Sequence, residues 1–228
     1  MSHRHQLLAA LAALMLTGGL ATVAALPAGA ATPQCGEHCI EVYSTLFGSE
    51  ANPRFVETVF HGVAKAGQPT VLAASKSTNS AADLIPMIAS GSEFYEKGLV
   101  SSAVDAHYGS LHVLQLQYAP DGRPTGLCVG LKTAAYQGEG LSLLPCSIPT
   151  LTVFIIDTPD APAAAAERHF PIVAASTAEF SHPYAMTFQG NAAPNAQPFP
   201  QIHVDRLIGN PSDVPSRQLW GSIVGVVK

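Results

Sequence analysis

The sequence predicts an all-β protein in which three similar strand-turn-strand pieces build one barrel with approximate three-fold symmetry. Three observations carry this prediction. The 19 glycines and 18 prolines are spread along the chain and divide it into short runs, which is typical of many strands joined by turns. Apolar and polar residues alternate in the clearest of these runs. The same layout of strands and turns also recurs three times.

Residues 1–30 have the features of a secretory signal peptide. A short basic region around Arg4 precedes an uncharged apolar stretch at 7–16, and the small residues at 28–30 fit a cleavage site. A membrane anchor is the competing interpretation, but Pro27 and the glycines before it interrupt the apolar stretch. We therefore expect a secreted, extracellular protein, with residues 31–228 forming a single domain and no membrane contact after cleavage.

The charge of the chain argues against nucleic-acid and membrane partners. The full sequence has 11 basic and 16 acidic residues, and removal of the signal peptide takes away only Arg4, which changes the formal net charge from −5 to −6. No cluster of lysine and arginine provides the basic stripe that a phosphate backbone or an anionic lipid surface requires. The expected partners are instead an extracellular glycan or another secreted protein.

Four cysteines in a secreted chain indicate disulfides, and four cysteines permit three pairings. We favour Cys128 with Cys146, which closes a hairpin-like loop, and Cys35 with Cys39, which closes a much smaller one. The first could contribute about 3 kcal/mol by restricting the unfolded chain. A metal or redox site at Cys35, His38 and Cys39 is the alternative, although two thiols and one imidazole are an incomplete tetrahedral set.

The strands are predicted from short apolar runs bounded by turn residues. In the run that ends at Tyr118, a period of two places Val113 on one face and Leu114, Leu116 and Tyr118 on the other. Asp121-Gly122 then turns the chain. The predicted strands are 40–43, 55–60, 70–74, 113–118, 127–131, 141–144, 153–156, 184–188, 201–204 and 222–227.

Two helices are predicted between the strands. The first spans 92–108, where Phe94 and Val104 fall near one stripe and Gly98 weakens the pattern. The second spans 161–168, an alanine-rich segment that a loop could also explain.

Three segments share one layout and define the repeats, at approximately 55–90, 111–157 and 180–228. Each contains a strand, a turn-rich connection, a second strand and then an apolar closing residue, which is Leu84, Phe154 or Trp220. A short helical or loop insertion separates the first repeat from the second. The three copies predict a three-fold barrel.

The motifs in these repeats resemble the ricin B-type β-trefoil lectins. Those lectins carry a cysteine in one strand, a second cysteine after the next strand, and a Gln-x-Trp closure. The matching positions here are Gly126-Leu127-Cys128-Val129-Gly130, Leu144-Pro145-Cys146 and Gln218-Leu219-Trp220. The resemblance covers roughly 55–228 as a pattern, with both cysteines only in the second repeat and Gln-x-Trp only in the third. It implies a β-trefoil fold and, by family, sugar binding.

The resemblance also indicates where a sugar site would lie. Lectins of this family hold the sugar with an aspartate just after the core of the Cys-bearing strand, an aromatic ring and an amide near the closing motif. The aspartate position falls on Gly130 in the second repeat, on Glu57 or Thr58 in the first, and on Met186 or Thr187 in the third. The family's aspartate is therefore missing from all three repeats.

Three residues remain as candidate ligand contacts under this resemblance. Glu57 is the acidic residue that could replace the aspartate in the first repeat, and Tyr136 and Tyr184 are the aromatic rings that could stack against a sugar. Each has a simpler interpretation as a core or rim residue.

No catalytic motif stands out in the sequence. Nucleophile elbows, His-Glu-x-x-His helices and glycine-rich phosphate loops are absent, and the histidines have no metal-ligand spacing. We therefore expect no cofactor and no metal, and we favour a protein that is not an enzyme. A triad or a carboxylate pair assembled from distant positions stays open, because such sites are defined by geometry.

The prediction is thus a secreted, monomeric, non-catalytic binding module for extracellular carbohydrate or cell-wall glycan. The alternative is a protein-interaction or inhibitor-type β-trefoil that acts on another secreted protein. A hydrolase without a recognisable motif is the third hypothesis. Competition by free sugar, recovery of a protein partner, or turnover would distinguish the three.

Overall fold

The computed structural model of the chain describes part of the sequence, and all of the described residues lie in one unit, Thr32–Lys228. The predicted signal peptide and Cys35 lie outside the described residues, so the signal peptide stays a prediction. The described ranges are 38–53, 55–58, 63–72, 80–159, 162–166, 168–188, 200–208 and 213–224.

Strands from all three repeats close into an antiparallel barrel. Phe170, just before β10, and Trp220, at the start of β13, exchange backbone hydrogen bonds of 3.0 and 3.1 Å, which joins the two ends of the strand order. This closure pairs strand edges that would otherwise be open. The order around the barrel is β13 (Trp220–Val224), β1 (Ile40–Ser44), β4 (Leu84–Ser90), β5 (His112–Tyr118), β9 (Phe154–Ile156) and β10 (Ile172–Ala174).

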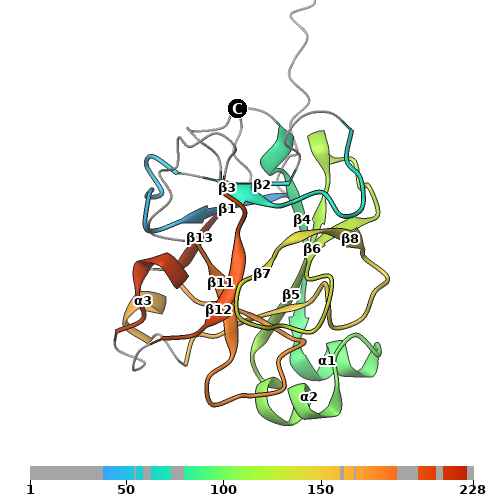
Figure 1. Ribbon diagram of the computed structural model, residues 1–228, viewed down its shortest axis with the longest axis vertical. Coiled ribbons are helices and arrows are strands. Elements are labelled where there is room, and N and C mark those ends of the chain that lie inside the picture. Colours follow the sequence, from blue (N-terminus) through green and yellow to red (C-terminus); the bar gives the residue numbers. More distant parts are fainter. Residues whose placement is uncertain are drawn as a thin grey trace, which may run out of the picture. The chain divides into compact units, whose positions relative to one another are not determined.

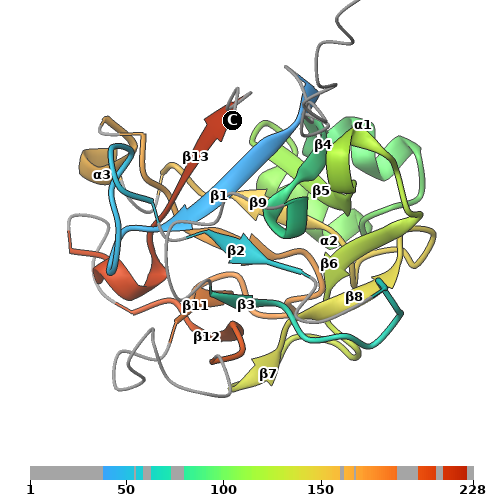
Figure 2. The same cartoon turned by 90° about the horizontal axis from the view of Figure 1, so that it is seen from above.

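Three hairpins, one from each repeat, lie side by side next to the barrel (Figure 2). They are the three strand-turn-strand pieces that the sequence predicts, and in each of them the two strands pair antiparallel. A further short strand, β7, pairs with the third hairpin. The strands are β2 (Val56–Glu57) with β3 (Val71–Leu72), β6 (Leu127–Gly130) with β8 (Ser142–Pro145), and β11 (Tyr184–Thr187) with β12 (His203–Arg206), beside β7 (Glu139–Gly140).

A ring of three backbone hydrogen bonds joins these hairpins. Thr70 N donates to Leu141 O at 2.9 Å, Leu141 N donates to Ile202 O at 2.8 Å, and Ile202 N donates to Thr70 O at 2.9 Å. Each of the three residues directly precedes the second strand of its hairpin. The ring therefore confirms both the three-fold relation and the alignment of the repeats.

The three predicted closing residues occupy equivalent positions in the core. Leu84, Phe154 and Trp220 each begin a barrel strand. All three are fully buried in the same apolar cluster. An all-β trefoil architecture with a central three-fold core is thus confirmed.

Strand β5 separates two apolar layers, as its alternating sequence predicts. Leu114, Leu116 and Tyr118 lie in the barrel core, whereas Val113 lies in a second cluster with Phe94. Since successive side chains of a strand point to opposite faces, one strand serves both layers.

Burial raises the pKa of Tyr118 to about 12, with further contributions from the carboxylates of Asp83 and Asp121. A pKa above the ordinary value of 10.0 means that the folded state favours the neutral phenol. This contribution to stability is fully present below pH 10.0 and is lost as the pH rises towards about 12. We expect Tyr118→Phe to lose less stability than the parent protein between about pH 9 and about pH 11.5, measured by urea unfolding.

The insertion between repeats one and two folds as two short helices rather than the single helix predicted at 92–108. These are α1 (Gly91–Glu96) and α2 (Ser102–Tyr108), at the tip of the β4–β5 hairpin (Figure 1). Gly98 has a φ of 69°, a left-handed conformation that ends α1. Ser101 Oγ then accepts a hydrogen bond from Val104 N at 3.2 Å and starts the second helix.

Several boundaries differ from the sequence prediction. Strands β4, β7 and β10 were not predicted, β12 begins two residues later than expected, and β13 begins two residues earlier. The predicted helix at 161–168 is the shorter α3 (Pro162–Ala166). None of the helices formed by the described residues combines the length and hydropathy of a membrane-spanning segment.

The favoured disulfide in the second repeat is confirmed. Cys128 and Cys146 are bonded, with 4.9 Å between their Cα atoms, and link the β6–β8 hairpin to the turn after it. Cys39 is buried and also disulfide-bonded. Its pairing with Cys35 stays a prediction, because Cys35 is outside the described residues.

Candidate functional site

A polar cleft of about 390 Å³ opens where β7 lies against β12. Strand β7 belongs to the connection within the second repeat, and β12 is the second strand of the third repeat. The cleft therefore depends on the packing of these two repeats. The residues that line it are Gln137, Gly138, Gly140, Gln201, His203 and Asp205.

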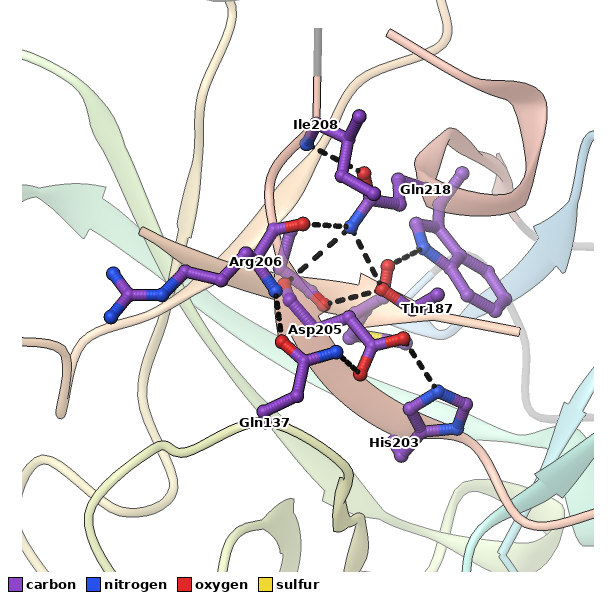
Figure 3. Close-up of polar contacts among 10 residues, drawn as sticks. Gln137, Thr187, His203, Asp205, Arg206, Ile208 and Gln218 are labelled. Atoms are coloured by element: carbon purple, nitrogen blue, oxygen red, sulfur yellow. Dashed lines mark hydrogen bonds and ion pairs between the residues drawn. The ribbon is translucent and has the colours of Figure 1, made fainter. Parts of the chain in front are cut away.

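Asp205, one of the lining residues, is a carboxylate that is held through both oxygens (Figure 3). His203 and Asp205 are two residues apart on β12, so their side chains lie on one face of the strand. His203 Nε2 lies 2.9 Å from Asp205 Oδ2, and Gln137 Nε2 donates to Asp205 Oδ1 at 2.7 Å. These contacts fix the position of the carboxylate before any ligand arrives.

The same glutamine ties the two repeats together. Gln137 Oε1 accepts a hydrogen bond from the backbone N of Arg206 at 3.1 Å, while its amide nitrogen holds Asp205. Both ends of the Gln137 amide are therefore bonded to neighbouring residues of β12.

Gly140 leaves room for the side chain of Gln201 on the β7 side of the cleft. A Cβ at Gly140 would lie 2.6 Å from Nε2 of Gln201, so a larger residue there would require that side chain to shift. Gln201 Nε2 donates to Leu141 O at 2.8 Å. The Gln201 amide is thus held along the wall of the cleft.

Gln218 of the Gln-x-Trp motif bonds to the two strands of the third hairpin, one of which carries cleft residues (Figure 3). The fully buried Gln218 donates from Nε2 to Thr187 Oγ1 at 3.0 Å and to Arg206 O at 2.9 Å. Its Oε1 accepts from Ile208 N at 3.0 Å, and Trp220 Nε1 donates to Met186 O at 2.9 Å. The Gln218 amide therefore holds β11 and β12 together.

The positions that correspond to the family's aspartate are internal in this protein. Thr58, Met186 and Thr187 are buried, and Thr58 Oγ1 donates to Ala81 O at 3.1 Å. A Cβ at Gly130 would lie 2.6 Å from the backbone oxygen of Leu151, so an aspartate there would require the backbone to move. These positions are therefore buried within the fold.

The three predicted contact residues lie in different repeats. Glu57 is buried in β2, where it pairs with Val71 of β3. Tyr136 directly precedes Gln137 and is 51% exposed. Tyr184 begins β11 and pairs with Arg206 of β12. The hydrogen bond between Gln137 and Arg206 connects the neighbours of the two tyrosines.

The two tyrosines differ in how their rings are held. A hydrogen bond with Glu139 raises the pKa of Tyr136, and its ring stays half-exposed. The guanidinium of Arg206 lies 4.5 Å from the centre of the Tyr184 ring and covers one of its faces. Arg206 also forms an ion pair with Glu179. Tyr136 is thus the more accessible of the two rings.

Sequence reasoning did not select the residues that line the cleft. The signal present in the sequence is His203-x-Asp205 on a predicted strand, which places an imidazole and a carboxylate on one face. The spacing of the histidines, His203 included, predicts no metal site. Within the described residues, no group of three or more His, Cys, Asp or Glu side chains could hold a metal ion.

Comparison with solved structures supports the fold. The structure is similar to that of ThreeFoil, a designed three-fold symmetric β-trefoil, with a TM-score of 0.52 and 8% sequence identity. The match covers 82% of this chain and 98% of ThreeFoil. A Caenorhabditis elegans protein of unknown function matches 85% of the chain over 96% of its own length, with a TM-score of 0.47 and 11% identity. No family model and no curated protein matches the sequence.

A third similar structure is much longer than this chain. It is the Saccharomyces cerevisiae protein O-mannosyltransferase Pmt1-Pmt2 complex bound to its sugar donor, matched over 83% of this chain and 25% of that one, with a TM-score of 0.44 and 11% identity. At these identities the likeness to ThreeFoil shows the fold alone.

Proposed function

We propose that this protein is a secreted, non-catalytic β-trefoil module that binds extracellular carbohydrate in the cleft between β7 and β12. The observation that carries the proposal is the preorganised set of polar groups around Asp205, which His203 and Gln137 hold from two sides. The proposal extends the lectin resemblance to a site built from different residues.

The chemistry of the lining suits a neutral, hydroxyl-rich ligand. Sugar hydroxyls both donate and accept hydrogen bonds, and the cleft offers carboxylate, imidazole and amide groups. No lysine or arginine is among the lining residues, which disfavours a phosphate or sulfate ligand. Tyr136, which directly precedes Gln137 and is half-exposed, is the aromatic residue that we propose for contact with the apolar face of the sugar.

A protein-binding function is the second candidate, and one observation favours it. Ile88 on β4 and Tyr95 on α1 are large apolar side chains that are 50% and 44% exposed. Both belong to the region around the insertion, where a partner protein could cover them. A hydrolase is less favoured, because the His203–Asp205 pair has no serine, threonine or cysteine beside it among the residues that line the described cleft.

Carbohydrate binding by the oxidised protein tests the proposal. We expect saturable binding to at least one member of a broad glycan and polysaccharide panel, with competition by the free sugar. We expect Asp205→Asn and Gln137→Ala to weaken this binding by at least about tenfold, since the first replaces the central carboxylate and the second removes the amide that holds it.

The controls separate loss of the site from loss of the fold. His112→Ala, which changes an exposed histidine at the start of β5, should bind like the parent protein. Thermal unfolding should show that Asp205→Asn remains folded. A blank panel for the folded parent protein, or full binding by both cleft variants, would contradict the proposal; a partner recovered from culture fluid would then favour the second candidate.

A further inference from the structure

The turn that carries Gln137 is defined by backbone hydrogen bonds. Glu139 N donates to Tyr136 O at 3.1 Å and closes the turn. Gly138, its third residue, has a φ of 81°, a conformation that favours glycine at this place in a turn. Gly138 N also donates to Val204 O at 2.9 Å, which attaches the turn to β12.

The first repeat contains the same turn with different side chains. Gln68 N donates to Lys65 O at 3.1 Å, and Gly67 has a φ of 84°. Gly67 N donates to Leu143 O at 2.7 Å, which attaches this turn to β8. Both turns end two residues before a member of the ring of three backbone hydrogen bonds. The two turns are therefore equivalent under the approximate three-fold symmetry.

The polar groups of the cleft have apolar counterparts in the first repeat and its neighbour. Counted from the ring of hydrogen bonds, Ala66 is the counterpart of Gln137. Leu144, which is buried, is the counterpart of Asp205. The same backbone arrangement thus forms without the amide and the carboxylate of the cleft.

Glu139 is the buried acidic residue of the turn that carries Gln137. It is 7% exposed and accepts hydrogen bonds from the hydroxyl of Tyr136 and from Thr133 Oγ1, the latter at 3.5 Å. Its counterpart Gln68 instead accepts from the backbone N of Lys65 at 3.3 Å. Burial of a carboxylate is unfavourable unless its contacts offset the loss of water. Since the equivalent turn forms without a carboxylate, the fold of the turn does not account for Glu139.

From this contrast we propose that Glu139 is a positioning residue for the ligand site. Its carboxylate joins Thr133 to Tyr136, and so holds the segment that brings the Gln137 amide to Asp205 (Figure 3). Glu139 is not among the residues that line the cleft, so it acts through its neighbours. The inference rests on the proposed carbohydrate site, because it assigns Glu139 to the support of that site.

Replacement of Glu139 tests the positioning role, and Gln68→Ala at the equivalent place in the first repeat is the matched control. The probe is the soluble oligosaccharide that binds the parent protein most tightly in the glycan panel. We expect Glu139→Ala to weaken its binding by at least about tenfold. Glu139→Gln, which keeps an acceptor oxygen, should stay within about threefold of the parent protein, and Gln68→Ala should bind like the parent protein.

Two NMR signals report the positioning role without a sugar. The ¹³Cζ signal of Tyr136 should titrate at a lower pH in Glu139→Ala than in the parent protein, because the carboxylate that raises the pKa of this phenol is gone. The side-chain amide signals of Gln137 should move towards those of a solvated glutamine in Glu139→Ala and stay in place in Gln68→Ala. A loss of stability alone would move neither signal in a variant that thermal unfolding shows to be folded.

The outcomes separate this inference from the proposed function. Equal sugar binding by the parent protein and by folded Glu139→Ala would overturn the positioning role and leave carbohydrate binding intact. Unchanged Gln137 amide signals in Glu139→Ala would overturn it whether or not a sugar binds. A blank panel together with displaced Gln137 signals would contradict carbohydrate binding but support Glu139 as the residue that positions the turn.

Discussion

Trp220→Ala is expected to lower the free energy of unfolding by about 4 kcal/mol. The indole is fully buried at the three-fold core beside the residues that close the other two repeats. Its removal leaves a large cavity and also takes the hydrogen-bond donor from Met186 O. Because Trp220 is the single tryptophan of the chain, unfolding should be followed by far-UV circular dichroism in urea rather than by tryptophan fluorescence.

Trp220→Phe is the control for the volume of this side chain. Phenylalanine keeps most of the apolar volume but cannot donate to Met186 O, so we expect a loss of about 2 kcal/mol, smaller than that of the alanine variant. A loss below about 1 kcal/mol for Trp220→Ala would contradict the central role of the closing residues in the core.

Gln218→Ala is expected to cost about 3 kcal/mol, the second-largest effect. The amide satisfies the backbone oxygen of Arg206, the backbone nitrogen of Ile208 and the hydroxyl of Thr187, and the truncation leaves all three without this partner. Buried polar groups that lose a partner carry the full cost of their removal from water. Urea unfolding of the variant measures this loss.

Gln137→Ala is the matched control for the loss of an amide. Gln137 is exposed, so water can replace its contacts, and we expect a stability loss below about 1 kcal/mol. Equal losses of unfolding free energy for Gln218→Ala and Gln137→Ala would contradict the assignment of Gln218 to the support of β11 and β12 and of Gln137 to the ligand site.

The repeats could be predicted because each of them depends on residues that are close together in the sequence. Strand alternation around Val113 and the recurring closing residues Leu84, Phe154 and Trp220 are all visible in the sequence, and all fall where the three-fold core needs them. The Cys128–Cys146 pairing followed from the same hairpin layout.

The unpredicted strand β4 shows why some elements were missed. Pro86 lies inside this strand, and proline within an apolar run argues against a strand in a sequence. In the structure β1 pairs with β4 only at Leu84. Beyond that residue, no described strand lies on the β1 side of β4 to accept a backbone hydrogen bond from position 86, so the missing N–H of Pro86 costs nothing there. The tertiary arrangement therefore tolerates a residue that local patterns exclude.

The candidate site was harder to predict than the fold. His203-x-Asp205 is a local signal, but Gln137 reaches Asp205 across 68 positions of sequence. Only the pairing of β7 with β12 brings them together, and β7 is too short to be recognised from its two residues. The family resemblance instead indicates positions such as Gly130. A Cβ at Gly130 would lie 2.6 Å from the backbone oxygen of Leu151, so this position has no room for a ligand-binding side chain.

The most direct measurement of the central claim is NMR mapping of a bound sugar on the ¹⁵N-labelled, oxidised protein. The carbohydrate proposal predicts that a competing soluble sugar shifts the backbone amide signals of Gly138, Gly140, Gln201 and His203, in a saturable manner. Signals from α1 and α2 should stay in place. Shifts confined to other surfaces, or no shifts with any sugar of the panel, would contradict a carbohydrate site between β7 and β12.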